Sequence, residues 1–201
     1  MTSQEIKQIA KEFYISPSLV KTVFEVEAAG AGFFTDWNGQ PRIKIQFEPH
    51  EFVRQLKKQG INVTSQKAGN YHLIYVDRIF VLKNKVDTQK EEYDAFNKAF
   101  KINPIAALYS TSWGLGQIMG YNFAAAGYSS VGEMITEFRK SEVNQLRGMM
   151  NFIKNTFSKG QRLIEHLRQG NFEAFAYGYN GPAHKKYNYV PRLQAAFNKF
   201  C

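Results

Sequence analysis

The chain has 201 residues, of which 44% are hydrophobic and 15% aromatic. Such a chain can build one sizeable core, and its composition excludes an intrinsically disordered protein. The formal net charge of +9 predicts a polyanionic partner, namely nucleic acid, an anionic membrane surface or an anionic wall polymer, although simple solubility would also explain it. With Cys201 as its one cysteine, the chain cannot form an internal disulfide or a cysteine metal cluster.

The sequence gives little support for binding to a membrane, a metal ion or a nucleic acid. No stretch of 18 apolar residues occurs and the N-terminal segment lacks a secretory signal, so we expect synthesis in the cytoplasm and no stable membrane insertion. The four histidines are scattered without ligand spacing, so no metal site or cofactor is expected. The pairs Lys57-Lys58 and Lys185-Lys186 are typical of a solvated surface, so no nucleic-acid partner is expected.

After a helix near residues 3–13, a second helix is expected to end at a carboxyl group. Ser16 is a suitable N-cap and Pro17 suits the first helical position. Glu27 lies four residues after Val23, on the apolar stripe of this helix, and the glycine-rich segment 28–32 ends it. An inward-facing glutamate is costly unless it is paired or holds a proton, and a protonated carboxyl is what a general acid needs.

A β-hairpin is expected next, with its turn around residues 36–39. Residues 42–48 alternate between polar and apolar side chains, so Ile43, Ile45 and Phe47 share one face. Glu48 falls on the solvated face, which suits a carboxylate that stays ionised. A helix near 49–58 follows, whereas residues 61–88 are compatible with either short strands or a packed loop.

Residues from Thr88 onward are expected to be helical throughout. One helix begins there, and the others lie near 104–108, 130–138, 141–157, 160–168, 171–178 and 190–200. The predicted fold class is therefore α+β and mainly α, with a small sheet, and residues 1–201 are expected to form a single domain.

Two further stretches carry candidate ligand-binding side chains. In the run 110–120, Trp113 can stack on the apolar face of a sugar and Gln117 can hydrogen-bond a hydroxyl or amide, while the glycines fit a close-packed joint equally well. Tyr179 and Asn180 precede a Gly-Pro turn signal, so they either face a cleft or simply end a helix.

Together these stretches resemble the N-acetylmuramidase family of phage and prophage endolysins, within the lysozyme-like superfamily. The matching segments are 26–33, 45–52, 110–122 and 179–182. The chain departs from the family pattern where Glu27-Ala28-Ala29-Gly30 replaces Glu-Ser-Gly-Gly and where Gly116-Gln117 replaces Phe-Gln. Many family members carry a separate wall-binding module, and we expect none within these 201 residues.

The resemblance implies a helical lysozyme-like lobe with a small hairpin beside an active-site cleft. It also implies a glycoside hydrolase that cleaves the β-1,4 bond between N-acetylmuramic acid and N-acetylglucosamine in peptidoglycan, and so lyses the bacterial wall. Glu27 matches the family's catalytic glutamate. The side chains expected to bind the sugars are Trp113, Gln117, Met119, Tyr179 and Asn180. We expect a monomer that reaches periplasmic or external peptidoglycan after release or export from the host cytoplasm, drawn there by opposite charge.

The sequence leaves open which residue supplies a second carboxylate. Glu48 has suitable strand geometry and could instead orient the substrate or a water. Asp36 follows Glu27 by nine residues, as in smaller phage lysozymes, but also has an ordinary explanation as a turn residue. The alternative functions are a lytic transglycosylase, which forms an anhydro sugar without water, and a non-catalytic wall-binding or phage structural protein.

Overall fold

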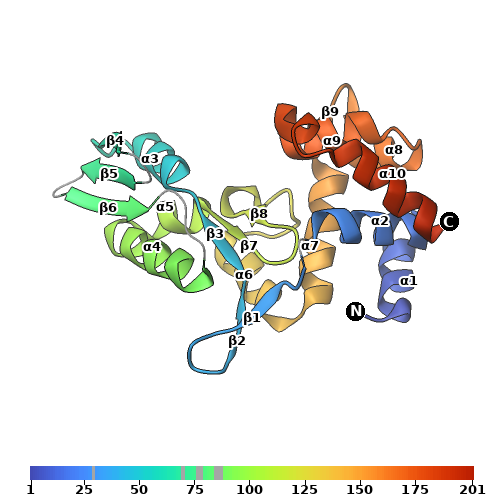
Figure 1. Ribbon diagram of the computed structural model, residues 1–201, viewed down its shortest axis with the longest axis horizontal. Coiled ribbons are helices and arrows are strands. Elements are labelled where there is room, and N and C mark those ends of the chain that lie inside the picture. Colours follow the sequence, from blue (N-terminus) through green and yellow to red (C-terminus); the bar gives the residue numbers. More distant parts are fainter. Residues whose placement is uncertain (29, 69–70, 76–78, 84–87) are drawn as a thin grey trace.

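The computed structural model describes residues 1–201 apart from 29, 69–70, 76–78 and 84–87 (Figure 1). The described helices are α1 (Ser3–Glu12), α2 (Pro17–Glu27), α3 (Pro49–Lys58), α4 (Gln89–Ile102), α5 (Pro104–Tyr109), α6 (Val131–Lys140), α7 (Glu142–Asn155), α8 (Leu163–Arg168), α9 (Phe172–Asn180), α10 (Tyr189–Phe200) and the short 3-10 helices η1 (Gly120–Asn122) and η2 (Gly181–Lys185). This arrangement confirms a mainly helical α+β fold.

The strands are short and form small antiparallel sheets. They are β1 (Phe33–Thr35), β2 (Pro41–Ile43), β3 (Ile45–Phe47), β4 (Thr64–Ala68), β5 (Tyr71–Tyr75), β6 (Ile79–Lys83), β7 (Thr111–Trp113), β8 (Ile118–Met119), β9 (Phe157–Ser158) and β10 (Gln161–Arg162). Their orders are β1-β2, β3-β7-β8, β4-β5-β6 and β10-β9. Of the two interpretations left open for residues 61–88, short strands are the one found in the described part of that range, and residues 69–70, 76–78 and 84–87 lie outside it.

Helix starts follow the capping residues that the sequence provides. The Ser16 hydroxyl accepts a hydrogen bond from the Leu19 N–H, and Pro17 occupies the first turn of α2. Thr88 and Glu91 form a reciprocal capping box at the start of α4. These local signals explain why most predicted helices are found close to their predicted bounds.

The predicted hairpin is confirmed, but the alternating segment 42–48 is divided between two sheets, with residues 42–43 in β2 and residues 45–47 in β3. β2 pairs with β1 around the turn at Asp36, whereas β3 pairs with β7 in the register Ile45↔Trp113. The expectation of helix throughout after Thr88 is wrong for residues 157–158 and 161–162, which pair as β9 and β10, and it is also wrong for residues 111–119. Their pairing partner lies far away in the sequence, and the left-handed backbone of Gly114 (φ 69°) turns β7 back towards β8.

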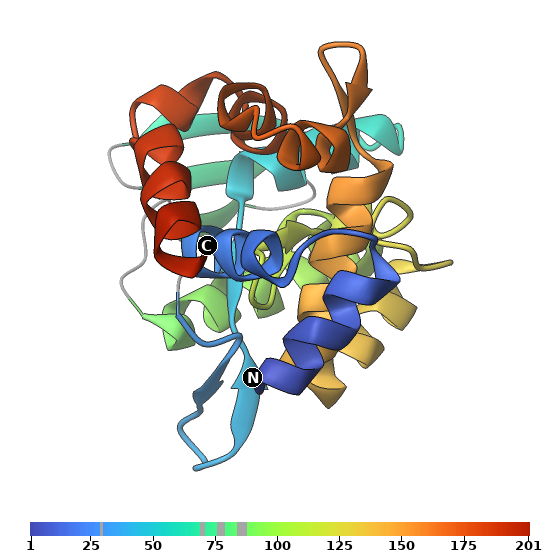
Figure 2. The same ribbon diagram turned by 90° about the vertical axis from the view of Figure 1, so that its right-hand side faces the viewer.

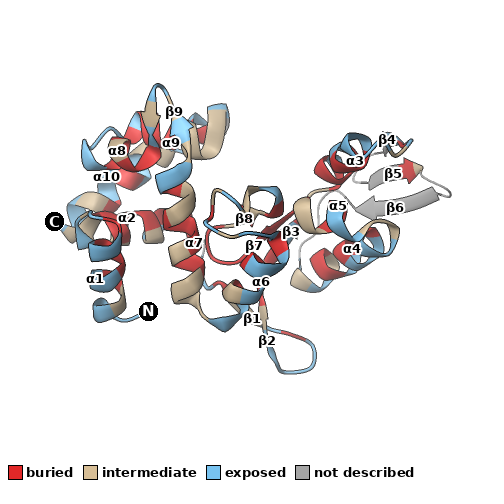
Figure 3. Cartoon of the chain, turned by 180° about the vertical axis from the view of Figure 1, so that it is seen from behind, coloured by how far each residue is buried: buried red, intermediate tan, exposed pale blue. Residues whose placement is uncertain are grey.

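Helices lie on both sides of the sheet that contains β3, β7 and β8. Figure 1 shows α3, α4 and α5 with β4–β6 on one side, and α1, α2 and α8–α10 on the other. In Figure 2, α10 lies beside α2, the helix pair with the most extensive contact. Figure 3 shows buried residues along the inner faces of α2 and α7 and through β3 and β7, where they belong to one continuous core. Within the described ranges, no helix has the length and apolar character needed to span a membrane.

Gly120, the first residue of η1, provides a test of how closely η1 packs on α5. A Cβ atom at Gly120 would overlap the backbone carbonyl oxygen of Leu108, which cannot rotate away. We expect Gly120→Ala to lower the free energy of unfolding by at least about 2 kcal/mol. The matched control is Gly132→Ala in α6, where the nearest atom to the added Cβ is Ser130 Oγ at 3.8 Å. In urea unfolding, Gly132→Ala should leave the free energy of unfolding unchanged or raise it by up to about 1 kcal/mol. An equal loss of stability in the two variants would contradict the prediction.

Candidate active site

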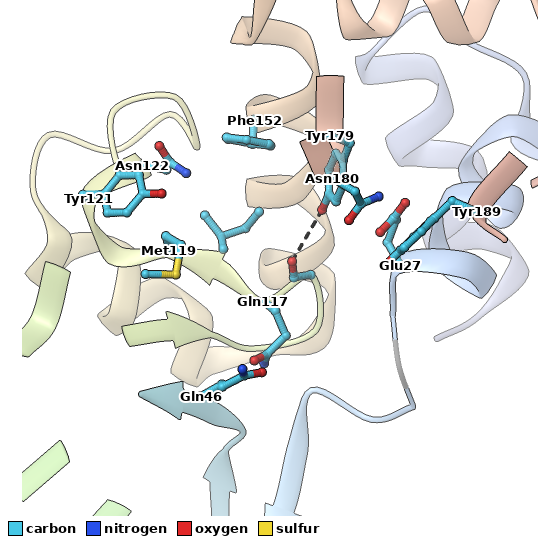
Figure 4. Close-up of a pocket in the computed structure, with 12 residues that line it drawn as sticks. Glu27, Gln46, Gln117, Met119, Tyr121, Asn122, Phe152, Tyr179, Asn180 and Tyr189 are labelled. Atoms are coloured by element: carbon cyan, nitrogen blue, oxygen red, sulfur yellow. Dashed lines mark hydrogen bonds between the residues drawn. The ribbon is translucent and has the colours of Figure 1, made fainter. Parts of the chain in front are cut away.

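A pocket of about 400 Å³ lies between the α2–α9 side of the molecule and the β3-β7-β8 sheet (Figure 4). Its lining comes from segments that are far apart in the sequence: Glu27, Gln46, Gly116, Gln117, Ile118, Met119, Tyr121, Asn122, Phe152, Tyr179, Asn180 and Tyr189. Five side chains that the sequence singled out therefore meet here, namely Glu27, Gln117, Met119, Tyr179 and Asn180.

Glu27 is the last residue of α2, and its carboxyl group is buried at the edge of this pocket. The residue is 8% exposed, and Oε1 has no hydrogen-bond partner among the described residues. Burial raises the pKa of Glu27 from 4.5 to about 8, and the Asn180 amide and the Arg192 charge lower it less strongly. The carboxyl group is therefore protonated at neutral pH.

Asn180 ends α9 directly beside this carboxyl group, as Figure 4 shows. Its Nδ2 is the other buried side-chain polar atom without a partner in the described part of the chain. Orphaned buried donors are rare because they lose their hydrogen bonds to water. The Asn180 donor and the Glu27 carboxyl oxygen therefore lie side by side at the pocket, where a ligand can reach them.

Tyr179 fixes the end of α9 against the sheet. Its ring lies 5.6 Å from those of Phe152 and Phe175, measured between centroids. Its hydroxyl donates a long hydrogen bond of 3.4 Å to the carbonyl oxygen of Gly116 (Figure 4). Burial raises the pKa of this hydroxyl well above its usual range, so it stays protonated and able to donate.

Arg192 holds the C-terminal end of α2, and nothing in the sequence pointed to it. Its Nη2 donates to the carbonyl oxygen of Val26 over 2.9 Å, one of the carbonyls that a helix end leaves unpaired. Its guanidinium carbon lies 5.1 Å from the ring of Tyr189, which lines the pocket. A cation at a helix C-terminus is favourable, and this one fixes the backbone beside Glu27.

Glu48 does not line the pocket but contacts a side chain that does. It is the N-cap residue of α3, and its Oε1 accepts a hydrogen bond of 2.7 Å from Nε2 of the pocket residue Gln46. Its Oε2 lies 3.4 Å from Nδ1 of His50. Burial raises the pKa of Glu48, while His50 and Gln46 act in the opposite direction. In this geometry Glu48 orients the amide of Gln46.

The outer edge of β3, opposite β7, is held by side chains from α4. The amide of Gln89 exchanges two hydrogen bonds of 2.9 Å with the backbone of Ile45. The carboxyl group of Glu92 accepts the Phe47 N–H over 2.8 Å. These contacts replace a neighbouring strand, and they fix the backbone on both sides of Gln46.

The structure places two other candidates away from the pocket. Asp36 accepts hydrogen bonds from the N–H groups of Asn38 (2.9 Å) and Gln40 (3.0 Å) and pairs with Arg42 (3.2 Å), which is the role of a turn residue. Trp113 is 2% exposed, and its indole N–H donates to the Leu108 carbonyl oxygen over 3.2 Å. A ring this deeply buried has no free face to stack on a sugar.

Two glycines of the run 110–120 allow close packing against α7. A Cβ atom on Gly116 would lie 2.7 Å from Met149 Sδ, and one on Gly114 would lie 2.7 Å from Gln145 Oε1. Gln145 is fully buried, and its Oε1 accepts the Leu115 N–H over 2.7 Å. The loop between β7 and β8 therefore rests on α7, and this contact places Gln117 and Met119 at the pocket.

A carboxyl group kept protonated by burial, beside an open pocket rich in amides and aromatic rings, is the arrangement that general-acid chemistry on a sugar needs. The model of the N-acetylmuramidase family matches residues 16–201. The fold is similar to the crystal structure of the Burkholderia AP3 phage endolysin, with a TM-score of 0.79 and 28% identity over 100% of this chain and 70% of that one. No curated protein sequence matches the chain. The chain belongs to the N-acetylmuramidase family and is an endolysin-like glycoside hydrolase that acts on peptidoglycan.

Proposed function

We propose that the protein hydrolyses the β-1,4 bond between N-acetylmuramic acid and N-acetylglucosamine in peptidoglycan, with Glu27 as the general acid. The observation that carries this proposal is the buried Glu27 carboxyl group, whose pKa is about 8 and which faces the pocket. Membership of the N-acetylmuramidase family supports the choice of bond. The +9 net charge supports an anionic wall polymer as the substrate.

Glu27 can supply both proton transfers of the reaction. The protonated carboxyl gives its proton to the glycosidic oxygen as the C1–O bond breaks and an oxocarbenium-like sugar forms. A water then bonds to C1, and its proton returns to the Glu27 carboxylate. Atoms and charge balance over the cycle, and the enzyme ends in its starting state.

The amides around the pocket suit an N-acetylated sugar. The Asn180 amide lies beside the Glu27 carboxyl group and lines the pocket, where it can donate to a hydroxyl or an acetamido oxygen. Gln46 and Gln117 offer further amide groups on the opposite wall (Figure 4). Within the described lining, Glu27 is the one carboxyl group, and we assign Glu48 the role of positioning Gln46.

A single carboxyl group also suits a lytic transglycosylase, in which a hydroxyl of the substrate takes the place of water. Mass spectrometry of digested peptidoglycan separates the two reactions. Hydrolysis leaves reducing muramic acid ends, each carrying the atoms of one added water. Anhydromuramyl products in their place would overturn the hydrolase proposal while leaving Glu27 as the acid.

The pH dependence of the reaction tests the protonation state of Glu27. Because the acid must be protonated, we expect kcat/KM to be limited by Glu27 only above about pH 8, where it should fall about tenfold per pH unit. Replacement of Arg192 by glutamine removes a charge that lowers this pKa, so the falling limb should move to higher pH. Rates on soluble peptidoglycan fragments check both expectations, and a limb that Arg192→Gln leaves unmoved would contradict the assignment.

A further inference from the structure

A second cavity, of about 430 Å³, lies at the base of the β1–β2 hairpin, where β2 meets α4 and α6. The hairpin itself projects from the body of the molecule (Figure 1). The polar part of the cavity lining comes from Arg42, Tyr93, Asn97 and Arg139. The proposed hydrolysis of the sugar bond uses none of these residues.

Arg42 is held rigidly at this cavity. Its guanidinium carbon lies 4.7 Å from the ring centroid of Trp37 and 4.7 Å from that of Tyr93, and these two rings contact each other with centroids 6.2 Å apart, so the group lies in the angle between two adjoining aromatic rings. Its Nε pairs with Asp36 Oδ2 over 3.2 Å. No described residue accepts a hydrogen bond from its two terminal nitrogens. This fork is therefore pre-organised to bind a carboxylate.

Arg139 adds a second cation from α6. Its side chain is exposed and forms no ion pair with any residue in the described ranges. Burial raises the pKa of the Tyr93 hydroxyl to about 12, and the charges of Arg42 and Arg139 both act to lower it, which places both cations near that ring. Asp36 offsets one of these charges, so the cavity keeps a net positive charge.

We propose that this cavity binds a carboxylate of the peptide stems that peptidoglycan carries on its muramic acid units. This inference rests on the proposed function, because it takes peptidoglycan as the substrate. Arg42 and the pocket residue Gln46 lie on the same polar face of the segment that contains β2 and β3. They are four residues apart, which corresponds to about 13 Å along an extended chain. An extended peptide of four residues spans about 13 Å as well. A stem attached to a sugar in the active-site pocket therefore reaches the two arginines.

The test measures binding without turnover, in the Glu27→Gln background. Arg139→Gln is added because Arg139 is exposed and its side chain holds no structural hydrogen bond within the described residues. Intact sacculi are compared with glycan strands from which an amidase has removed the peptides. We expect Arg139→Gln to weaken binding to sacculi by about three- to fivefold and to leave binding to the stripped strands unchanged. Lys7→Gln, which removes one positive charge from the exposed face of α1, is the matched control.

Equal weakening on both substrates, or no change on either, would overturn the proposal. A loss as large in the Lys7→Gln control would show general charge attraction and would overturn it too. This experiment measures binding by an inactive variant and does not depend on turnover. The proposed hydrolysis is tested separately, by the products that the parent enzyme forms.

Discussion

Replacing Glu27 with glutamine is expected to lower kcat on peptidoglycan by about a thousandfold, with a much smaller effect on substrate binding. Glutamine has nearly the same shape and is also neutral, so it fits the buried site that the protonated carboxyl occupies. It cannot give a proton to the glycosidic oxygen. The loss should therefore fall on the chemical step, and release of reducing ends from peptidoglycan measures it.

A matched control lies two residues earlier on the same helix. Glu25 is exposed and pairs with Lys199 of α10 over 2.8 Å, well outside the pocket lining. Glu25→Gln makes the same carboxyl-to-amide replacement on the surface of the helix, and we expect its kcat to stay within about twofold of the parent value. If Glu27→Gln retained more than a tenth of the parent activity, the acid would have to be another residue, and the proposed mechanism would fail.

The sequence predicted those parts of the molecule that local chemistry determines. Ser16 and Thr88 mark the starts of α2 and α4 because capping involves residues only three positions apart. The alternation at 42–48 predicted that Ile43, Ile45 and Phe47 are buried, which they are. The pairing of β3 with β7 was missed because it joins residues about 66 positions apart, and nothing within residues 111–119 specifies that partner.

The same contrast separates the predicted and unexpected parts of the site. Glu27 could be placed on an inward-facing stripe because Val23 lies one helical turn before it. Arg192 and Tyr189 could not be linked to it, because only the packing of α10 on α2 brings them there. Trp113 looked like a sugar platform because tryptophan suits both a core and a sugar site, and the core contact is the one that the structure shows.

The second large effect concerns the stability of the protein as a function of pH. Folding raises the pKa of Glu27 from 4.5 to about 8, so the folded state holds a proton that the unfolded state releases between these two values. The contribution of Glu27 to stability is therefore fully present below about pH 4.5, is lost progressively up to about pH 8, and stays lost above it. Integrated over that window, the loss amounts to at most about 5 kcal/mol.

Glutamine at position 27 does not ionise, so the Glu27→Gln variant should escape this loss. We expect the two proteins to have similar free energies of unfolding near pH 4.5, and the variant to be more stable by several kcal/mol near pH 9. Glu92, whose pKa burial raises to about 7, titrates in both proteins, so its effect cancels in the difference. Urea unfolding at the two pH values provides the measurement. If the difference in unfolding free energy between the two proteins did not change with pH, Glu27 would be ionised in the folded protein at neutral pH and could not act as the acid. If the difference grows with pH, the burial that acid catalysis needs lowers the stability of the fold.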